Sequence, residues 1–300
     1  MKKVVVITSG GDAPGMNAAL YGIVKKATEE NIEVYGAKCG YIGIIEENFV
    51  PLTIENTFPY LRQGGTILET IRFPAFQEKE VQRTAVEIME KHDFDALIVI
   101  GGDGSYKGAA KLSQFYFPVI AIPATIDNDI FGTENSLGFS TAVSNATAVI
   151  DKLSTTAASH GHIFVVEVMG RHSGNIAKKV GKAVGADMTI IPEKEFTTEE
   201  VIESLDLSKK QDKKYSMIVT AEGAISCLEL TKNIERNSKY KVHPLILGHI
   251  QRGGDPACED RILGIEFGEV AIKLLKKKKY GIALRVYGGK IDALPLSEYL

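Results

Sequence analysis

Apolar residues occur along the chain in two patterns that alternate with each other, short continuous runs and segments with helical spacing. Short apolar runs rich in valine and isoleucine are followed by loops with glycine or acidic residues, and then by segments with apolar residues at helical spacing. The runs predict buried β-strands, and the spaced segments predict amphipathic helices. The predicted strands are 4–8, 32–37, 95–100, 117–122, 162–168, 188–192, 215–221 and 242–247. The predicted helices are 17–30, 80–91, 106–112, 136–152, 175–184, 199–205, a segment ending near 236, and 261–277, with a turn at 40–43.

Strands that alternate with helices predict right-handed βαβ units and a parallel sheet. At least five of the predicted strands end in Gly, Asp, Glu, Arg or His. Ligands bind at the carboxyl ends of the strands in open α/β sheets, so this many polar strand ends predict two facing α/β layers that share a cleft. The expected fold class is α/β with mainly parallel sheets and the active site in the cleft.

The composition is that of a soluble globular protein. The 300 residues are 44% hydrophobic with a net charge of −3, which gives no reason to expect nucleic acid or an anionic membrane as a partner. No apolar run approaches the ~20 residues of a transmembrane helix, and the run after Lys3 is too short for a signal peptide. The three cysteines are scattered without a C-x-x-C pair, so neither a disulfide framework nor a zinc site is indicated. We expect a cytoplasmic protein.

A hydroxyl and two carboxylates follow the predicted strand 117–122, in the stretch Pro-Ala-Thr-Ile-Asp-Asn-Asp-Ile at 123–130. Thr125, Asp127 and Asp129 alternate, so on an extended segment their side chains would project to the same side. The two carboxylates could then supply a general base and help to hold a cation. The alternative interpretation is an Asx-rich turn without catalytic function.

Two glycine-rich loops also follow predicted strands. The loop at 9–17, Ser-Gly-Gly-Asp-Ala-Pro-Gly-Met-Asn, could bind phosphate through backbone N–H groups, although it is neither G-x-G-x-x-G nor a Walker A motif. The loop at 101–105, Gly-Gly-Asp-Gly-Ser, adds a carboxylate that could hold the magnesium of a nucleotide. A purely structural tight turn is the alternative here. With the arginines near other strand ends, these loops favour a kinase that uses a nucleoside triphosphate and magnesium on a small anionic acceptor.

Five motifs, in order along the chain, resemble the bacterial type of ATP-dependent 6-phosphofructokinase. They are 9–17, 101–105, 123–129, Met-Gly-Arg at 169–171, and Gly-His-Ile-Gln-Arg-Gly-Gly at 248–254. The resemblance implies two Rossmann-like domains, an ATP and magnesium domain at 1–138 plus 251–300 and a sugar-phosphate domain at 139–250. It also implies a homotetramer with sites shared between subunits, and fructose 6-phosphate as substrate.

The resemblance also implies roles for individual residues. Asp127 would be the base for the 1-hydroxyl of the sugar, and Asp103 would hold Mg²⁺ with Asp129 close to the same chemistry. Thr125 and the backbone of Gly11 would contact the transferring phosphoryl group, while Arg72 and Arg171 would stabilise its charge. The implied ATP contacts are Gly11, Tyr41, Arg72, Phe73, Gly102, Asp103, Gly104, Ser105 and Gly108. The implied sugar-phosphate contacts are Thr125, Ile126, Asp127, Met169, Gly170, Arg171, Glu222, His249, Ile250, Gln251 and Arg252, with the positions of His162 and His243.

The phosphoryl donor is expected to be ATP. In the family, glycine at position 104 and a small residue at position 124 accompany ATP, whereas the pyrophosphate-dependent branch resembles Asp and Lys at these positions. This chain has Gly104 and Ala124.

This chain departs from the family where the 6-phosphate of the sugar is bound. The family uses two arginines from the neighbouring subunit, and the matching positions are His162 and His243. Histidine has a reference pKa of about 6.5 and lacks the bidentate fork of arginine, so affinity for fructose 6-phosphate should be lower and should improve in mild acid. The alternative is that these histidines with His249 and Arg252 suffice.

Two further departures concern regulation and the end of the chain. Positions where the family's effector site has cations hold Tyr21, Ile54, Ser154 and Gln211, leaving Lys25, Lys213 and Lys214. We therefore expect little regulation by ADP or phosphoenolpyruvate. The sequence ends at Leu300, about one helix earlier than is usual in the family, which puts the packing of the sugar-phosphate domain in question.

Three hypotheses follow. The first is a working 6-phosphofructokinase with a weakened phosphate grip. The second is a kinase of the same mechanism that acts on a different sugar acceptor. The third is a poorly active or regulatory subunit of a hetero-oligomer, in which a sister chain supplies the arginines.

Overall fold

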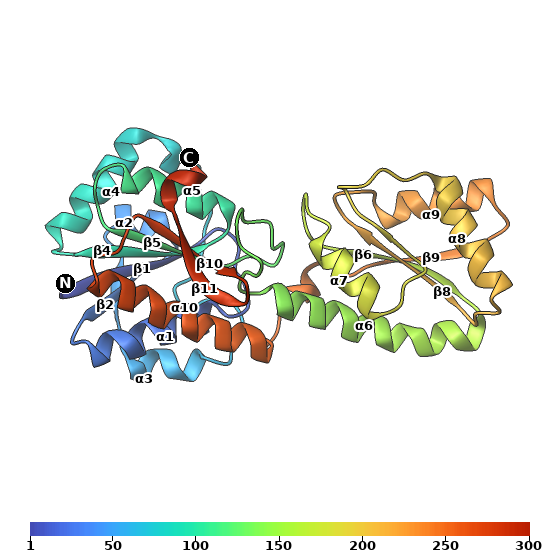
Figure 1. Ribbon diagram of the computed structural model, residues 1–300, viewed down its shortest axis with the longest axis horizontal. Coiled ribbons are helices and arrows are strands. Elements are labelled where there is room, and N and C mark those ends of the chain that lie inside the picture. The colour runs from blue at the N-terminus through green and yellow to red at the C-terminus, as the bar shows by residue number, and fades with distance from the viewer. The chain divides into compact units, whose positions relative to one another are not determined.

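The computed structural model describes residues 1–300 and divides into two compact units. Unit 1 consists of Met1–Thr125, Ile130–Phe139 and Gly253–Leu300, and unit 2 consists of Ile126–Asp129 and Ser140–Arg252. Each unit is a mainly parallel sheet with helices packed on it (Figure 1), so the predicted α/β class with two Rossmann-like domains is confirmed. None of the helices combines the length and the hydropathy that crossing a bilayer requires.

Unit 1 contains a seven-stranded sheet in the order β11-β10-β5-β4-β1-β2-β3. The five inner strands are parallel, and the edge strands β3 and β11 are antiparallel to their neighbours. All six residues of β4 are buried, which explains its uninterrupted apolar sequence, because a central parallel strand is covered on both faces. The strands are β1 (Lys3–Ser9), β2 (Glu33–Ala37), β3 (Phe49–Leu52), β4 (Ala96–Gly101), β5 (Val119–Pro123), β10 (Ile282–Tyr287) and β11 (Lys290–Pro295).

Helices cover both faces of this sheet (Figure 1). Helices α1 and α10 pack on the face that carries Val4 and Val6, while α4 and α5 pack on the face that carries Val5 and Ile7. The alternation follows from the two-residue period of a strand. The helices are α1 (Met16–Glu29), α2 (Tyr41–Ile45), α3 (Ile54–Thr57), α4 (Lys79–Lys91), α5 (Asp103–Ser113) and α10 (Cys258–Lys276), with short 3₁₀ helices η1 (Phe58–Tyr60), η2 (Pro74–Gln77) and η4 (Leu296–Tyr299).

Helices α1 and α10 lie close together because glycines line their contact. A Cβ atom on Gly22 would lie 2.4 Å from the carbonyl oxygen of Ile265, and one on Gly268 would lie 2.5 Å from the carbonyl oxygen of Ala19. Gly15, with φ of 101°, similarly faces the backbone of Asp260. The loop that leads into α1 is therefore held against the start of α10.

Unit 2 contains a parallel four-stranded sheet in the order β7-β8-β6-β9. Helices α8 and α9 pack on one face around Val165 and Ile218. Helix α8 begins with a capping box in which Thr197 and Glu200 satisfy each other's backbone N–H groups. The elements are β6 (Ile163–Val168), β7 (Met188–Ile190), β8 (Ser216–Ala221), β9 (Val242–Ile246), α6 (Phe139–His160), α7 (Asn175–Ala183), α8 (Thr198–Lys210), α9 (Cys227–Asn237) and η3 (Gly248–Gln251).

The structure corrects several sequence-based boundaries. The expected turn at 40–43 is instead the start of α2, and the helix expected at 106–112 begins three residues earlier, at Asp103. The helix expected to end at 152 continues to His160. Strands β3, β10 and β11 were not expected, because most of their residues are partly or fully exposed. The edge strands β3 and β11 also contain proline, which is tolerated at sheet edges.

Candidate active site

The two glycine-rich loops lie side by side in unit 1 because β1 and β4 are neighbours in the sheet, with Ser9 paired to Gly101. Ser105 Oγ donates a hydrogen bond of 3.0 Å to the carbonyl oxygen of Ser9. Gly10 has φ of 91° and lies against Ser105, while Thr70 Oγ1 donates to its carbonyl oxygen at 2.8 Å. Gly11 follows in an exposed position in this loop.

Asp103 is the first residue of α5 and its side chain is half-exposed. Lys107, one turn further along, forms an ion pair with it at 2.7 Å. A single carboxylate fits Mg²⁺, which binds through one or two carboxylates together with phosphate oxygens and waters, and no larger cluster of His, Cys, Asp or Glu side chains suited to a metal is present. The next residue, Gly104, is exposed, and a Cβ there would meet nothing within 4 Å.

Tyr41 lies beneath the second glycine loop. It is 4% exposed and its hydroxyl donates a hydrogen bond of 2.8 Å to the carbonyl oxygen of Ser105. Its ring packs on Gly108, where a Cβ would lie 2.8 Å from the hydroxyl, and stacks on Phe76 at 3.9 Å between ring centroids. Burial raises the pKa of Tyr41 well above its ordinary value. Tyr41 therefore supports the loop from below.

The other expected nucleotide contacts in unit 1 lie at the surface. Gly102 precedes α5 and faces Thr125. A Cβ atom on Gly102 would lie 3.6 Å from Thr125 Cβ. Arg72 is exposed and Phe73 is half-buried, in the segment just before η2 that has no regular secondary structure.

The segment 126–129 belongs to unit 2 and is a turn, so the expectation of an extended segment with three aligned side chains is wrong. Ile126 and Asp127 form the turn, and Asn128 has φ of 50°, in the left-handed region. Ile126 is buried, Asp127 is half-buried and Asp129 is exposed. The physical reason for the turn is that asparagine adopts the left-handed region more readily than most residues.

The carboxyl group of Asp127 has a raised pKa. Burial is the largest cause, followed by the negative charges of Asp129 and Glu222, while Arg171 and Arg252 act in the opposite direction. The result is a pKa of about 6. Such a group is ionised at neutral pH yet more basic than an ordinary aspartate, which suits a general base.

Arg171 is held by the ends of two neighbouring strands, β6 and β8. The backbone N–H groups of Gly170 and Arg171 donate to Glu222 Oε1 at 3.2 and 2.8 Å. Gly223 allows the two strand ends to touch, since a Cβ there would lie 2.1 Å from the carbonyl oxygen of Arg171. Arg171 itself has φ of 57°, and it is exposed at the surface of unit 2.

Gln251 is completely buried, unlike the other residues of the motif at 248–254. Its Oε1 accepts a hydrogen bond from the N–H of Met169 at 3.3 Å, and its Nε2 donates to the carbonyl oxygen of Gly248 at 3.0 Å. Gln251 thus ties η3 to the end of β6. His249 and Ile250 are exposed and Arg252 is half-buried.

The structure brings His162 and His243 together, with ring centroids 4.3 Å apart. The parallel pairing of β6 with β9, in which Phe164 is opposite His243, fixes this arrangement. His160 stacks on His162 at 5.1 Å, and sequence reasoning missed it because the preceding helix was expected to end at 152. Burial and then the neighbouring imidazoles of His243 and His160 lower the pKa of His162.

Two of the three lysines expected to remain at effector positions are engaged in ion pairs. Lys25 pairs with Glu269 at 3.0 Å, and Lys213 pairs with Asp187. Tyr21 packs against Phe58, with ring centroids 5.6 Å apart.

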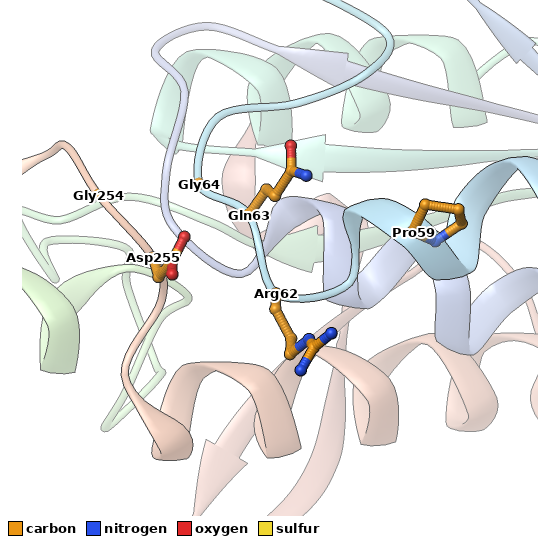
Figure 2. A pocket seen from close by; sticks show the side chains of 6 residues that line it. All are labelled: Pro59, Arg62, Gln63, Gly64, Gly254 and Asp255. Atoms are coloured by element: carbon orange, nitrogen blue, oxygen red, sulfur yellow. The ribbon is translucent and has the colours of Figure 1, made fainter.

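A pocket of about 650 Å³ in unit 1 lies outside the expected contacts (Figure 2). Asn17, from the first glycine motif, shapes it by donating hydrogen bonds to the carbonyl oxygens of Gln63 and Gly64 at 3.1 and 3.3 Å. The lining residues are Pro59, Arg62, Gln63, Gly64, Gly254 and Asp255.

Comparison with known proteins gives one consistent result. The sequence model of the family described as Phosphofructokinase matches residues 3–275. A protein of Listeria monocytogenes described as ATP-dependent 6-phosphofructokinase is 42% identical over 300 residues, covering 100% of this chain and 94% of that protein. A Bacillus thuringiensis protein with the same description is 44% identical over 291 residues, covering 97% of this chain and 91% of that protein.

Solved structures agree with the sequence comparison. Phosphofructokinase from Saccharomyces cerevisiae is similar with a TM-score of 0.91 and 30% identity, covering 100% of this chain. This chain spans 45% of that longer yeast chain. A pyrophosphate-dependent phosphofructokinase from Marinobacter aquaeolei has a TM-score of 0.89 at 24% identity, covering 84% of that chain, and supports the fold alone.

Proposed function

We propose that this chain, which belongs to the phosphofructokinase family, transfers the γ-phosphoryl group of ATP to the 1-hydroxyl of fructose 6-phosphate and so catalyses a step of glycolysis. Relatives named ATP-dependent 6-phosphofructokinase share 42–44% identity over nearly their whole length. The observation that carries the chemistry is the half-buried Asp127, with a pKa of about 6 beside two arginines. A kinase for a different acceptor, or a regulatory subunit, is less favoured by these full-length relatives.

The two substrates are assigned to different parts of the chain. Residues 1–138 plus 251–300 form the ATP domain in this proposal, and residues 139–250 form the sugar-phosphate domain. Support comes from the two adjoining glycine loops in unit 1 and from the polar strand ends of unit 2. Gly104 has open space around it, so the loop surface there is accessible to a nucleotide.

Phosphoryl transfer requires a base and a means of dispersing charge. In the proposed step, Asp127 accepts the proton of the 1-hydroxyl while the hydroxyl oxygen forms a bond to the γ-phosphorus. The bond from that phosphorus to the bridging oxygen of ADP breaks, and ADP leaves with its electron pair. Arg171 and Arg72 stabilise the charge on the transferring group, and Thr125 with the N–H of Gly11 orients it.

Asp103 would hold the Mg²⁺ that accompanies ATP, and Asp129 would lie near it. When bound, the ion neutralises charge on the phosphates. Lys107 forms an ion pair with the same carboxylate at 2.7 Å. Lys107 would have to release Asp103 when the ion binds.

The 6-phosphate of the sugar is assigned to His162 and His243 of a neighbouring subunit in a homotetramer, with His249 and Arg252. The touching rings of His162 and His243 support a shared anion site. Each imidazole must be protonated to offer positive charge, so the affinity for the 6-phosphate decreases as pH rises. Glu222 and Met169 would contact the sugar itself.

Regulation by ADP or phosphoenolpyruvate is proposed to be slight. The ion pairs of Lys25 and Lys213 leave little free positive charge at the effector positions, and Tyr21 and Ile54 supply none.

The test is to follow ADP and fructose 1,6-bisphosphate formation by the purified chain with fructose 6-phosphate and either MgATP or magnesium pyrophosphate. We expect equimolar products with ATP and negligible turnover with pyrophosphate. Ala124→Lys with Gly104→Asp is the matched donor variant and should lose ATP-dependent activity. Faster turnover of the wild type with pyrophosphate would contradict the donor assignment.

A further inference from the structure

We propose that Ser173 and Asn175 are positioning residues that hold the turn 126–129 and thereby present the Asp127 carboxylate to the acceptor hydroxyl. The inference rests on the proposed role of Asp127 as base. Neither residue belongs to the sequence motifs that pointed to the function, and both lie where β6 gives way to α7.

The contacts run from these two side chains to the main chain of the turn. Asn175 Nδ2 donates to the carbonyl oxygen of Asn128 at 2.8 Å and approaches that of Asp127 at 3.5 Å. Ser173 Oγ donates to the carbonyl oxygen of Asp127 at 3.2 Å. Two neighbouring carbonyl groups of the turn are therefore bound by donors from one short segment.

The serine hydroxyl is oriented by its own neighbour. The backbone N–H of Asn175 donates to Ser173 Oγ at 3.1 Å, which occupies a lone pair of that oxygen. A serine hydroxyl has one hydrogen to donate, and this arrangement directs it to the Asp127 carbonyl. Ser173 is 7% exposed, so few alternative partners compete for it.

The turn requires such an anchor because it has little regular structure of its own. Asn128 has φ of 50°, and the residues from 125 to 130 form no strand or helix. A backbone in the left-handed region persists where its surroundings determine it. The hydrogen bonds to the carbonyls of Asp127 and Asn128 fix the peptide groups on both sides of this strained residue.

The segment that carries the donors is itself closely packed. A Cβ on Gly170 would lie 2.4 Å from the carbonyl oxygen of Ser173, and one on Gly174 would lie 2.6 Å from Ile191 Cβ. The N–H of Gly174 donates to Glu193 Oε1 at 2.9 Å, and α7 is buried along Ile176.

The same short segment, 170–175, also carries Arg171. Glu222 holds Arg171 at the start of this segment, and the donors Ser173 and Asn175 lie at the end of the segment. The segment 170–175 thus sets the position of the proposed base, Asp127, relative to Arg171, which is proposed to stabilise the transferring phosphoryl group. Displacements of about 1 Å at such a site can cost about 100-fold in rate.

The experiment compares Asn175→Ala, Ser173→Ala and the double variant with the wild type and with Lys179→Ala, an exposed residue on the same helix. We measure kcat and KM for both substrates between pH 5 and 9, together with thermal unfolding. Asn175→Ala should lower kcat about 10-fold to 100-fold while changing either KM by less than about threefold. Ser173→Ala should act in the same direction, and Lys179→Ala should match the wild type.

A second readout does not depend on turnover. The pKa of Asp127, followed by carboxyl ¹³C NMR with Asp127→Asn for assignment, should fall from about 6 towards that of a free aspartate in Asn175→Ala, because the released turn exposes the carboxyl to water. The acid limb of kcat should move to lower pH with it. If the wild type fails to phosphorylate fructose 6-phosphate but the pKa falls in the variant, the proposed function is wrong and the positioning stands. An unchanged pKa and kcat in Asn175→Ala, or a fall in kcat that only tracks loss of folded protein, would overturn the inference.

Discussion

Replacing His162 and His243 by arginine should change how the enzyme's affinity for fructose 6-phosphate depends on pH. In the wild type, the proposed base Asp127 must be ionised, so kcat/KM falls as pH drops below about 6. The histidines must be protonated to bind phosphate, and the pKa of His162 lies below its ordinary value, so kcat/KM also falls as pH rises. The profile of kcat/KM for fructose 6-phosphate should be bell-shaped, with its maximum near pH 6.

The size of the expected change in kcat/KM follows from the protonated fractions of the histidines and of Asp127. A histidine with the reference pKa of about 6.5 is about 75% protonated at pH 6 and about 3% protonated at pH 8. A carboxyl with a pKa of about 6 is half ionised at pH 6 and nearly fully ionised at pH 8. For that reference pKa, the product of these fractions falls about 12-fold between pH 6 and 8 if one imidazolium is required, and about 300-fold if two are required. The lowered pKa of His162 makes the fall larger. At saturating sugar phosphate, the bound anion stabilises the imidazolium, so kcat should keep mainly the acid limb.

The assay is steady-state phosphorylation of fructose 6-phosphate between pH 5.5 and 8.5, with the wild type and with the double variant His162→Arg/His243→Arg. Arginine stays protonated throughout, so the double variant should lose the alkaline limb and bind the substrate more tightly at pH 8. It also controls for the substrate's own phosphate ionisation near pH 6. An alkaline limb that persists unchanged in the arginine variant would refute the assignment of the histidines to phosphate binding.

Three further predictions concern catalysis, stability and regulation. Arg171→Ala should lower kcat about 10²-fold to 10⁴-fold; a loss of less than about tenfold in the same assay would remove it from the proposed charge stabilisation. Gly268→Ala should lower the free energy of unfolding in urea by about 1–3 kcal/mol, because its Cβ would overlap the backbone of α1, whereas the exposed Glu266→Ala should stay within about 0.5 kcal/mol. Millimolar ADP or phosphoenolpyruvate should leave the half-saturating concentration of fructose 6-phosphate unchanged within about twofold, and a clear shift would show that Lys25 and Lys213 exchange their ion pairs for the effector.

Much of the fold could be predicted because its central strands carry strong local signals. β4 is apolar at every position, and glycine loops mark the ends of both β1 and β4. The hairpin of β10 and β11 was not predicted because most of its residues are partly or fully exposed, with only Ala283 and Leu284 buried in β10. Gly288 and Gly289, both with positive φ, are nevertheless a recognisable turn signal. Local patterns therefore predict strands that are buried on both faces better than strands with many exposed residues.

The candidate site could be predicted in its residue types but not in its geometry. Asp127 was identified from its motif, yet it lies on a turn and not on an extended segment. Burial raises its pKa most, followed by the charges of Asp129 and Glu222, while Arg171 and Arg252 lower it, and all of these except Asp129 are distant in the sequence. The contact of His160 with His162 likewise depends on where α6 ends. Such properties arise from tertiary packing, for which a short sequence window contains no signal.

The account's central claim is that Asp127 is the base of an ATP-dependent 6-phosphofructokinase. The most direct measurement is the rate of fructose 1,6-bisphosphate formation from MgATP and fructose 6-phosphate by the wild type and by Asp127→Asn near pH 6.5. We predict turnover by the wild type, and a loss of at least about 10²-fold in kcat for the variant with little change in the KM for either substrate. The absence of fructose 1,6-bisphosphate with the folded wild type, or an Asp127→Asn variant as active as the wild type, would contradict the claim.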